Sequence, residues 1–371
     1  MARPSNETES GKAVLELLDK FVCVRMVYAN GTDLTMFQFD NDLTFAAFFL
    51  NADRKIYGRY GTLPSPRSGV AGVSQRGFIA AMQGALELHR AYPSNEASLA
   101  DKRGPKSPVA VPEDFDDLVE YQNRIEWSTR AVSRSCMHCH QIGSARFQHY
   151  RYRKQPVPEN VLFPWPMPTA LGLVLDVDRV AHVQRVEEDS IGKRAGLEPG
   201  DDIVELAGQP ILSIADIQWV LHTANDPCRI AAVVHRGEQR VELELDLPRG
   251  FRRPRDGIPF RWTDRHLSLG RVSGLGIGVR LRDLTDDERR EAGIPKDRLA
   301  IVEASGGGRR FGRGSLTLEP GDTVVAIDGF DDRMSESDVY AHCLQKHAPG
   351  DVVKLTVMRG GKRIELRATL R

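Results

Sequence analysis

The sequence predicts a multidomain protein that combines an α/β unit with two α+β domains, and three observations predict it. The first hundred residues alternate helical and strand-like apolar patterns, as an α/β unit does. Polar, proline-rich stretches then separate this unit from the rest of the chain. Roughly the last 200 residues contain the same pattern of strands, turns and a helix two times. Such a repeat is typical of tandem domains. A chain of 371 residues is long enough for two or three such domains.

The composition favours no nucleic-acid or membrane partner. The 51 basic and 51 acidic residues cancel, so no overall field attracts nucleic acid or an anionic membrane. No stretch approaches the ~20 consecutive apolar residues that a transmembrane helix needs. The N-terminal sequence MARPSNETESGKAV is polar and lacks the apolar core of a secretory signal. We therefore expect neither a nucleic-acid partner nor a transmembrane segment.

Residues 11–97 predict a small α/β domain. Apolar residues at helical spacing, alternating β-branched residues and a long apolar run followed by a turn indicate its parts. The expected elements are a helix in GKAVLELLDKF (11–21), a strand in VCVRMVY (22–28), a strand pair in LTFAAFFLNADRKIYGRYG (43–61) and a helix over 74–89. The first strand of the pair is apolar enough to be a central strand that is buried on both faces.

This order of elements resembles the C-terminal two-thirds of a thioredoxin-like domain. FFLNADRKIYGRYG (48–61) is similar to the central hairpin of that family, in which an apolar strand meets an aspartate-containing turn. The family's C-x-x-C helix and first strand would lie before residue 11, and Phe45 stands where the family usually has a cis-proline. The resemblance implies a partial thioredoxin-like domain, whose chain would start upstream of Met1 and carry thiol-redox activity only with that segment.

Residues 98–166 predict a helical and linker segment. A proline-rich linker is followed by a charged helix over 113–133, with Phe115, Leu118, Tyr121 and Ile125 at near-helical spacing. The proline-rich sequence that ends the segment should run extended over the surface of whatever precedes it. The segment is too short to contain a cytochrome c fold.

The most reactive cluster of the chain lies in SRSCMHCHQ. Cys136, Cys139 and His140 have the C-x-x-C-H spacing by which c-type haem is attached. Both thiols can form thioethers to the haem vinyl groups, and the histidine then lies beneath the iron as its proximal ligand. Met167 is a candidate distal ligand, because a thioether raises the potential of haem iron. The motif predicts a covalent haem c.

Two other interpretations of this motif remain open. Cys136 and Cys139 could bind zinc together with His138, His140 or His149, because thiolate and imidazole suit that ion. Alternatively, the motif holds no cofactor and the two cysteines form a plain dithiol or disulfide. The remaining cysteines, Cys23, Cys228 and Cys343, lie singly in apolar stretches and are expected to be small buried hydrophobes.

The C-terminal half of the chain contains an internal repeat. The pentapeptide LEPGD occurs at 197–201 and again at 318–322, each time followed by an apolar strand and a small turn. A helix opened by Ser-x-x-Asp follows, at Ser213–Asp216 and at Ser335–Asp338, and each serine is an expected helix N-cap. Each copy ends in two strands around a tight turn.

The two copies resemble PDZ domains of the bacterial HtrA-type proteases. The similarity rests on ALGLVL, AGLEPGDDIVELAGQPI and SIADIQWVL in the first copy, and on GLGIGVRLRDLTDDERREAGI, LEPGDTVVAIDG and SESDVYAHCL in the second. It implies a first PDZ-like domain over 167–248, a linker over 249–264 and a second PDZ-like domain over 265–371. Each would be a small, partly open β-barrel or sandwich capped by helices. The second copy departs from the pattern at GGGRRFGRGS (306–315), which we interpret as a flexible loop.

A PDZ resemblance implies recognition of protein C-terminal tails or internal peptides by strand addition. A glycine-containing loop would receive the carboxylate, and the facing helix would form the pocket wall. The implied peptide-binding residues are Leu171, Gly172, Leu173 and Leu221 in the first copy, and Leu275, Gly276, Ile277 and Val339 in the second, with Val220 and Cys343 as alternatives on the two helices. A closed groove that serves only as a spacer is the alternative.

Protease activity is not expected, although HtrA-type proteases carry a serine protease domain before such modules. Ser144 lies in IGSAR, and the sequence contains no Gly-x-Ser-Gly-Gly nucleophile loop. The complete order of parts resembles exported bacterial proteins, common in planctomycetes, that join a thioredoxin-type domain to PDZ repeats.

We therefore expect a redox-linked electron carrier or sensor that carries haem and docks on peptides. This protein would be periplasmic or extracytoplasmic if haem is bound, and cytoplasmic otherwise. The alternatives are an interaction scaffold with a structural or zinc-bound motif, and a thioredoxin-like protein without its active C-x-x-C.

Overall fold

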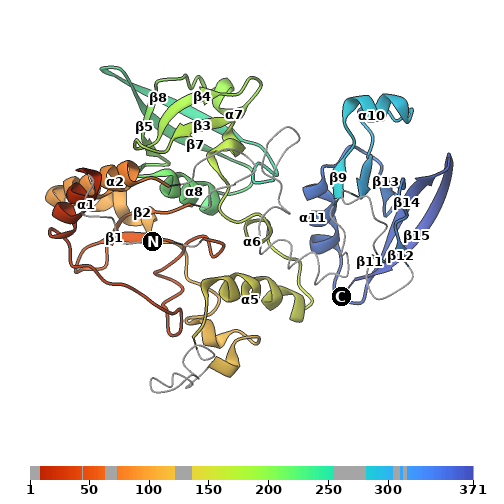
Figure 1. Cartoon of the computed structure of the whole chain (residues 1–371), viewed down its shortest axis with the longest axis horizontal. Coiled ribbons are helices and arrows are strands. Elements are labelled where there is room, and N and C mark those ends of the chain that lie inside the picture. The colour runs from red at the N-terminus through yellow and green to blue at the C-terminus, as the bar shows by residue number, and fades with distance from the viewer. Residues whose placement is uncertain are drawn as a thin grey trace. The chain divides into compact units, whose positions relative to one another are not determined.

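The computed structural model describes residues 9–43, 45–62, 73–121, 136–253, 281–303, 310–311 and 316–370. The chain divides into two compact units (Figure 1). Unit 1 comprises Met1–Ile142 and Pro164–Arg252, and unit 2 comprises Gly143–Phe163 and Arg253–Arg371. Among the described helices, none has the length and apolar character that crossing a membrane requires. The division into five segments made from the sequence stays a prediction.

The N-terminal part of unit 1 is a two-stranded hairpin packed with two helices. Its elements are α1 (Glu9–Leu18), β1 (Ala47–Leu50), β2 (Ile56–Tyr60) and α2 (Gln75–Ala91). β1 and β2 pair in antiparallel fashion, and the Ser74 side chain caps α2 by accepting from the Gly77 N–H at 2.9 Å. The predicted hairpin and both predicted helices are therefore confirmed. The thioredoxin-like interpretation stays a prediction.

Two strand predictions in this part are wrong. Residues 22–28 form no strand, and Val22 is 96% exposed. β-branched composition favours a strand only where a partner strand and an apolar face are available, and the structure gives this segment neither. β1 is not a central strand either. In the described residues its sheet has two strands, and Leu50 at its end is exposed.

Short helical turns connect this part to the CMHCH motif. They are α3 (Glu96–Leu99) and the 3₁₀ turns η1 (Ala100–Lys102), η2 (Pro112–Asp114) and η3 (Val119–Tyr121). The helix predicted over 113–133 is therefore not continuous in its described portion. Its remaining residues, 122–133, lie outside the described part of the chain.

The segment after the motif packs into unit 2. It contains most of α5 (Cys139–Tyr152) and all of α6 (Glu159–Leu162). Phe147, Val157, Leu162 and Phe163 are buried in the same core cluster as the strands of the second repeat. The prediction that this stretch runs extended over the preceding surface is wrong, because its apolar residues are buried in the core of unit 2.

The first repeat forms a sheet in the order β3-β4-β5-β7-β8, entered through the 3₁₀ turn η4 (Pro168–Leu171). All its paired neighbours are antiparallel. The elements are β3 (Leu173–Asp176), β4 (His182–Val186), α7 (Ile191–Ala195), β5 (Asp202–Leu206), β6 (Gln209–Pro210), α8 (Ile214–Thr223), β7 (Cys228–Arg236) and β8 (Gln239–Leu247).

The second repeat has the same strand order, β9-β10-β13-β14-β15, again with antiparallel neighbours. Its elements are β9 (Leu281–Asp283), α10 (Asp286–Glu291), β10 (Ile301–Glu303), β11 (Arg310–Phe311), β12 (Leu316–Thr317), β13 (Thr323–Ile327), α11 (Glu336–Lys346), β14 (Val352–Arg359) and β15 (Lys362–Thr369). β11 pairs with β12, so residues 310–311 of the predicted loop 306–315 form a short strand, and the other residues of that loop lie outside the described part of the chain. The sequence repeat is thus a repeat of sheet topology.

The LEPGD pentapeptide is a structural motif in both copies. Asp201 accepts hydrogen bonds from Arg236 at 2.8 and 3.0 Å and from the Glu198 N–H at 3.0 Å. Asp322 is bound in the same way by Arg359, at 2.8 and 2.6 Å. The motif therefore ties the turn before the third strand of each sheet to the end of the fourth strand through a two-point arginine–carboxylate contact.

Candidate functional site

The start of β3 is shaped by Gly172. This residue has φ +76 and ends η4, and its carbonyl accepts from the Glu187 N–H at 2.8 Å. A Cβ atom at this position would lie 2.1 Å from Ser190 Cβ. Positive φ and this close approach both require glycine. The expected glycine loop is present in the first repeat, but the Gly172 N–H already donates to Thr169 O at 2.9 Å.

The side chains predicted to line the first peptide groove lie in the core. Leu171, Leu173 and Leu221 are all buried within one apolar cluster of the first repeat. β3 itself is the terminal strand of its sheet, and no strand pairs with its outer side among the described residues. The structure therefore offers the backbone edge of β3, while the predicted pocket side chains are packed inward.

Helix α8 is covered by the N-terminal part of unit 1. Ser213 Oγ donates to Arg59 O at 2.6 Å, and the Arg59 N–H donates to Asp216 Oδ1 at 3.2 Å. Trp219 Nε1 donates to Asp101 O at 2.9 Å, and the Arg59 guanidinium carbon lies 3.9 Å from the centre of the Trp219 ring. This side of the helix is therefore bound by residues more than a hundred positions earlier in the chain.

A buried ion pair joins the same two parts. Lys102 Nζ lies 2.9 Å from Asp216 Oδ1, and both side chains are 0% exposed. Burial lowers the pKa of Lys102, and the attraction of Asp216 opposes this shift. A charge pair without access to water is stable only while both partners stay in place. The contact therefore fixes α8 against the η1 turn.

Met167 belongs to the packing of the first repeat. Its sulfur accepts hydrogen bonds from Thr62 Oγ1 and from Gln218 Nε2, both at 3.3 Å. Trp165, two residues earlier, stacks on His222 with ring centres 4.7 Å apart. These contacts direct the thioether toward polar groups of unit 1, and the role of Met167 as a distal ligand stays a prediction.

The CMHCH motif spans the start of α5. Cys139 and His140 are in its first turn, while Cys136 lies in the irregular segment before it. Cys139 Sγ donates to Leu43 O at 3.7 Å, and burial raises the pKa of its thiol. The Met137 N–H donates to Asn30 Oδ1 at 2.8 Å. The motif is thus held against residues 30–43 of unit 1.

The cysteines are all free thiols in this structure. Cys343 is buried, as expected, and burial raises the pKa of its thiol to about 12. Cys228 is half-buried. Cys23 is exposed, contrary to the prediction, because it lies in the segment 22–28 that forms no strand.

The second repeat contains a small apolar pocket of about 10 Å³. Val339 and Cys343, which lie one helical turn apart on α11, both line it, together with Leu281 of β9. The structure therefore brings together the two side chains proposed for the second pocket wall. The other predicted residues of this groove, Leu275, Gly276 and Ile277, lie outside the described part of the chain.

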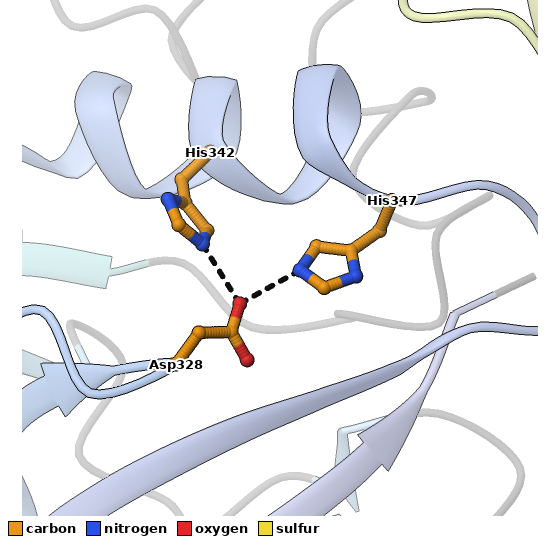
Figure 2. Close-up of side chains that lie close together, drawn as sticks. All are labelled: Asp328, His342 and His347. Carbon is orange, nitrogen blue, oxygen red and sulfur yellow. Dashed lines mark hydrogen bonds and ion pairs between the residues drawn. The ribbon is translucent and has the colours of Figure 1, made fainter.

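A cluster that sequence reasoning missed lies beside α11 (Figure 2). His342 Nε2 and His347 Nε2 each lie 2.7 Å from Asp328 Oδ2. Among the described residues, these three form the one group of His, Cys, Asp or Glu donor atoms that could hold a metal ion. The four residues of the alternative zinc site, Cys136, His138, Cys139 and His140, do not form such a group.

Only the pair of histidines five positions apart at the end of a predicted helix could have signalled this cluster. Burial acts to raise the pKa of Asp328, but hydrogen bonds from the Lys354 N–H and both histidines hold it below its usual range.

Comparison with known proteins identifies the first repeat. Residues 182–233 match the family model of the PDZ domain. A "Probable periplasmic serine endoprotease DegP-like" from Pseudomonas savastanoi is 25% identical over 195 residues, which are 51% of this chain and 37% of the relative. A protein of the same description from Rickettsia conorii is 23% identical over 134 residues, 35% of this chain and 26% of the relative. The chain thus contains a PDZ domain at residues 182–233.

Among solved structures, the HtrA3 PDZ domain bound to a phage-derived ligand (FGRWV) is 28% identical. It covers 18% of this chain and 60% of that chain, with a TM-score of 0.16. The chain spans about a quarter to two-fifths of the length of the curated relatives named above. The protease activity named for those relatives belongs to them.

Proposed function

We propose that the chain is an extracytoplasmic, non-proteolytic protein that binds extended peptides through its PDZ domain. The observation that carries this proposal is the position of β3, the terminal strand of its sheet, directly after the tight turn at Gly172. PDZ domains bind by adding a peptide strand to such an edge. The periplasmic description of the relatives supports the location. The absence of a Gly-x-Ser-Gly-Gly sequence supports a role without proteolysis.

In the first repeat, affinity would come from the main chain rather than from an open side-chain pocket. Leu171, Leu173 and Leu221 are already buried, so they have little apolar area left to offer. Val174 and Asp176 of β3 are half-buried and remain accessible to a neighbouring strand. Main-chain hydrogen bonds recognise an extended backbone with little dependence on its side chains. This repeat would therefore tolerate varied peptide sequences.

The second repeat is proposed as a second PDZ-like module. Its support is the shared strand order and the apolar pocket beside α11. β9 corresponds to β3 as the terminal strand. Val339 and Cys343 are themselves buried beside a pocket of about 10 Å³, so affinity in this module too would come mainly from the main chain.

Fluorescence anisotropy with a labelled FGRWV peptide tests peptide binding by the full chain. The free-acid peptide should bind, and its C-terminally amidated form should bind more weakly, because PDZ loops receive the terminal carboxylate. Hydrogen exchange then locates the site. Added peptide should slow exchange in β3 or β9 and leave the opposite edge strands, β8 and β15, unchanged. Binding by neither peptide, or equal protection of β8 and β15, contradicts the proposal.

A second candidate function is redox chemistry at the CMHCH motif. Its support is that Cys136 and Cys139 are free and that His140 lies in the first turn of α5. These three residues suit thioether attachment and proximal ligation, and a bound haem would supply one-electron transfer. Met167 would fill the distal position only if its sulfur left Thr62 and Gln218. The distal position would otherwise be open or filled by another group.

Expression with a signal peptide and haem-maturation machinery tests this candidate. A pyridine haemochrome spectrum and an intact mass increased by one haem are expected for the parent chain. The Cys136→Ser/Cys139→Ser variant, made in the same strain, should show neither. A parent chain without the mass increase excludes haem c, and peptide binding can still be measured on the same preparation.

A further inference from the structure

We propose that Asp328, His342 and His347 form a binding site for a divalent transition metal of the Zn²⁺ type. The site lies within the second repeat and is separate from the CMHCH motif. It does not depend on peptide binding. Imidazole nitrogen and carboxylate oxygen are common ligands of such ions.

The three side chains come from two elements and converge on one point (Figure 2). Asp328 directly follows β13, His342 is in the last part of α11, and His347 directly follows that helix. The donor atoms all lie within 4.8 Å of one another. Ligand atoms about 2.0–2.1 Å from a tetrahedral ion lie about 3.3 Å apart. Small side-chain rotations would therefore open the present 2.7 Å contacts enough to admit an ion.

The carboxylate of Asp328 is oriented by the neighbouring strand. Its Oδ1 accepts from the Lys354 N–H at 2.9 Å, and the Asp328 N–H donates to Lys354 O at 2.8 Å. This pair of contacts leaves Oδ2 directed at the imidazoles. Hydrogen bonds of this kind hold metal ligands in place and strengthen binding.

The first repeat shows that the fold itself does not need these residues. When the two repeats are superimposed in sequence on their LEPGD pentapeptides and on the serines that open α8 and α11, each of the three ligand positions has a counterpart in the first repeat. Ala207, Val220 and Asn225 stand there in place of Asp328, His342 and His347, respectively. Ala207 and Asp328 even share a left-handed backbone, with φ 51 and 49. The frame is thus the same, while three ligand-type side chains occur in the second repeat alone.

The burial of the cluster also suits a bound ion. The side chains of Asp328, His342 and His347 are 19%, 11% and 17% exposed. They are shielded from bulk water, yet a small ion can reach them and keep water as a fourth ligand. Each imidazole would bind through Nε2 and carry its remaining proton on Nδ1.

A bound ion would connect the end of α11 to the turn after β13. Because α11 also carries Val339 and Cys343, the ion would stiffen the helix that lines the apolar pocket.

The test uses the full chain with Cys136→Ser and Cys139→Ser, which removes the two thiols of the CMHCH motif. After chelator treatment, the chain is titrated with Zn²⁺ in competition with a chromophoric chelator. One equivalent of Zn²⁺ should bind per chain. His347→Asn introduces the residue of the first repeat, and it should weaken binding more than tenfold, because losing even a group that only supports a ligand costs about 10–100-fold. The control His235→Asn removes an exposed histidine outside the cluster and should bind zinc as the parent does.

Three results would overturn the proposal. The first is a chain that binds no equivalent of Zn²⁺, and the second is equal affinity in the parent and in His347→Asn. His342→Val, which introduces the first repeat's Val220, provides a second ligand deletion, and circular dichroism verifies that each variant is folded. Binding that is present in the wild-type chain but lost with Cys136→Ser/Cys139→Ser alone would also refute it, because the ion would then belong to the cysteine motif.

Discussion

Replacing Lys102 by methionine tests whether helix α8 is covered by the N-terminal part. Lys102 Nζ lies 2.9 Å from Asp216 Oδ1, and neither side chain is exposed. Methionine retains most of the length of the lysine chain but removes its charge, so the Asp216 carboxylate stays buried without a cation. Removing one partner of a buried pair costs about 3–5 kcal/mol. We expect the free energy of unfolding of unit 1 to fall by this amount.

A matched control has the same substitution and nearly the same distance. Lys193 Nζ lies 3.0 Å from Glu188 Oε1, but these side chains are 49% and 79% exposed. Lys193→Met should therefore change stability by less than about 1 kcal/mol. Urea denaturation at pH 7 measures both variants. Tryptophan fluorescence reports on the relevant region, because Trp165 and Trp219 pack in the core of the first repeat.

Equal destabilisation by Lys102→Met and Lys193→Met would refute the reasoning, since Lys102 would then be in contact with water. The double variant Lys102→Met/Asp216→Asn adds a further check. The Asp216 carboxylate also accepts from the N–H groups of Arg59 and Leu212, and an asparagine oxygen can keep part of this role. The double variant should therefore be more stable than Lys102→Met alone. If the changes in stability caused by Lys102→Met and by Asp216→Asn simply add up in the double variant, the two charges do not interact.

Two further predictions concern titration and thiol reactivity. Burial acts to raise the pKa of Asp201, but Arg236 and the Glu198 N–H hold it below its usual value. The stability this carboxylate contributes should be complete above the unfolded pKa of about 3.9 and be lost as the pH falls through the lower folded pKa. Denaturation between pH 6 and pH 3 should show this slope, and Arg236→Gln should flatten it; an equally steep slope in the variant would contradict the assignment. Cys343 has a thiol pKa of about 12 and is buried, so iodoacetamide at pH 8 should modify exposed Cys23 and spare Cys343. Peptide mass mapping checks this, and rapid modification of Cys343 would show that α11 opens.

Features that depend on neighbours in sequence could be predicted. The caps at Ser213 and Ser335 follow from side chains within one turn of their own helices. The hairpin of β1 and β2 follows from two apolar runs around a short turn. The repeated LEPGD pentapeptide marked the two sheets of equal topology, because the same short-range turn recurs in both. The glycine required at position 172 was also expected from its place in the loop.

Features that depend on distant contacts could not be predicted. Trp219 and Asp216 are bound by Asp101 and Lys102, more than a hundred residues earlier, and no local pattern specifies such a pairing. The cluster of Asp328, His342 and His347 was missed for a related reason. Asp328 meets His342 and His347 only because a turn folds back on the end of a helix.

The aspartate in the third helical position has a second role that the repeat reveals. In the first copy Asp216 pairs with Lys102, which comes from the segment before the CMHCH motif. In the second copy Asp338 pairs with Arg253, 2.7 Å away, which comes from the linker before that copy and also binds Glu159. A capping residue needs no distant cation. Because both copies nevertheless bind one from outside the repeat, this aspartate is best understood as the point at which each repeat anchors the chain that precedes it.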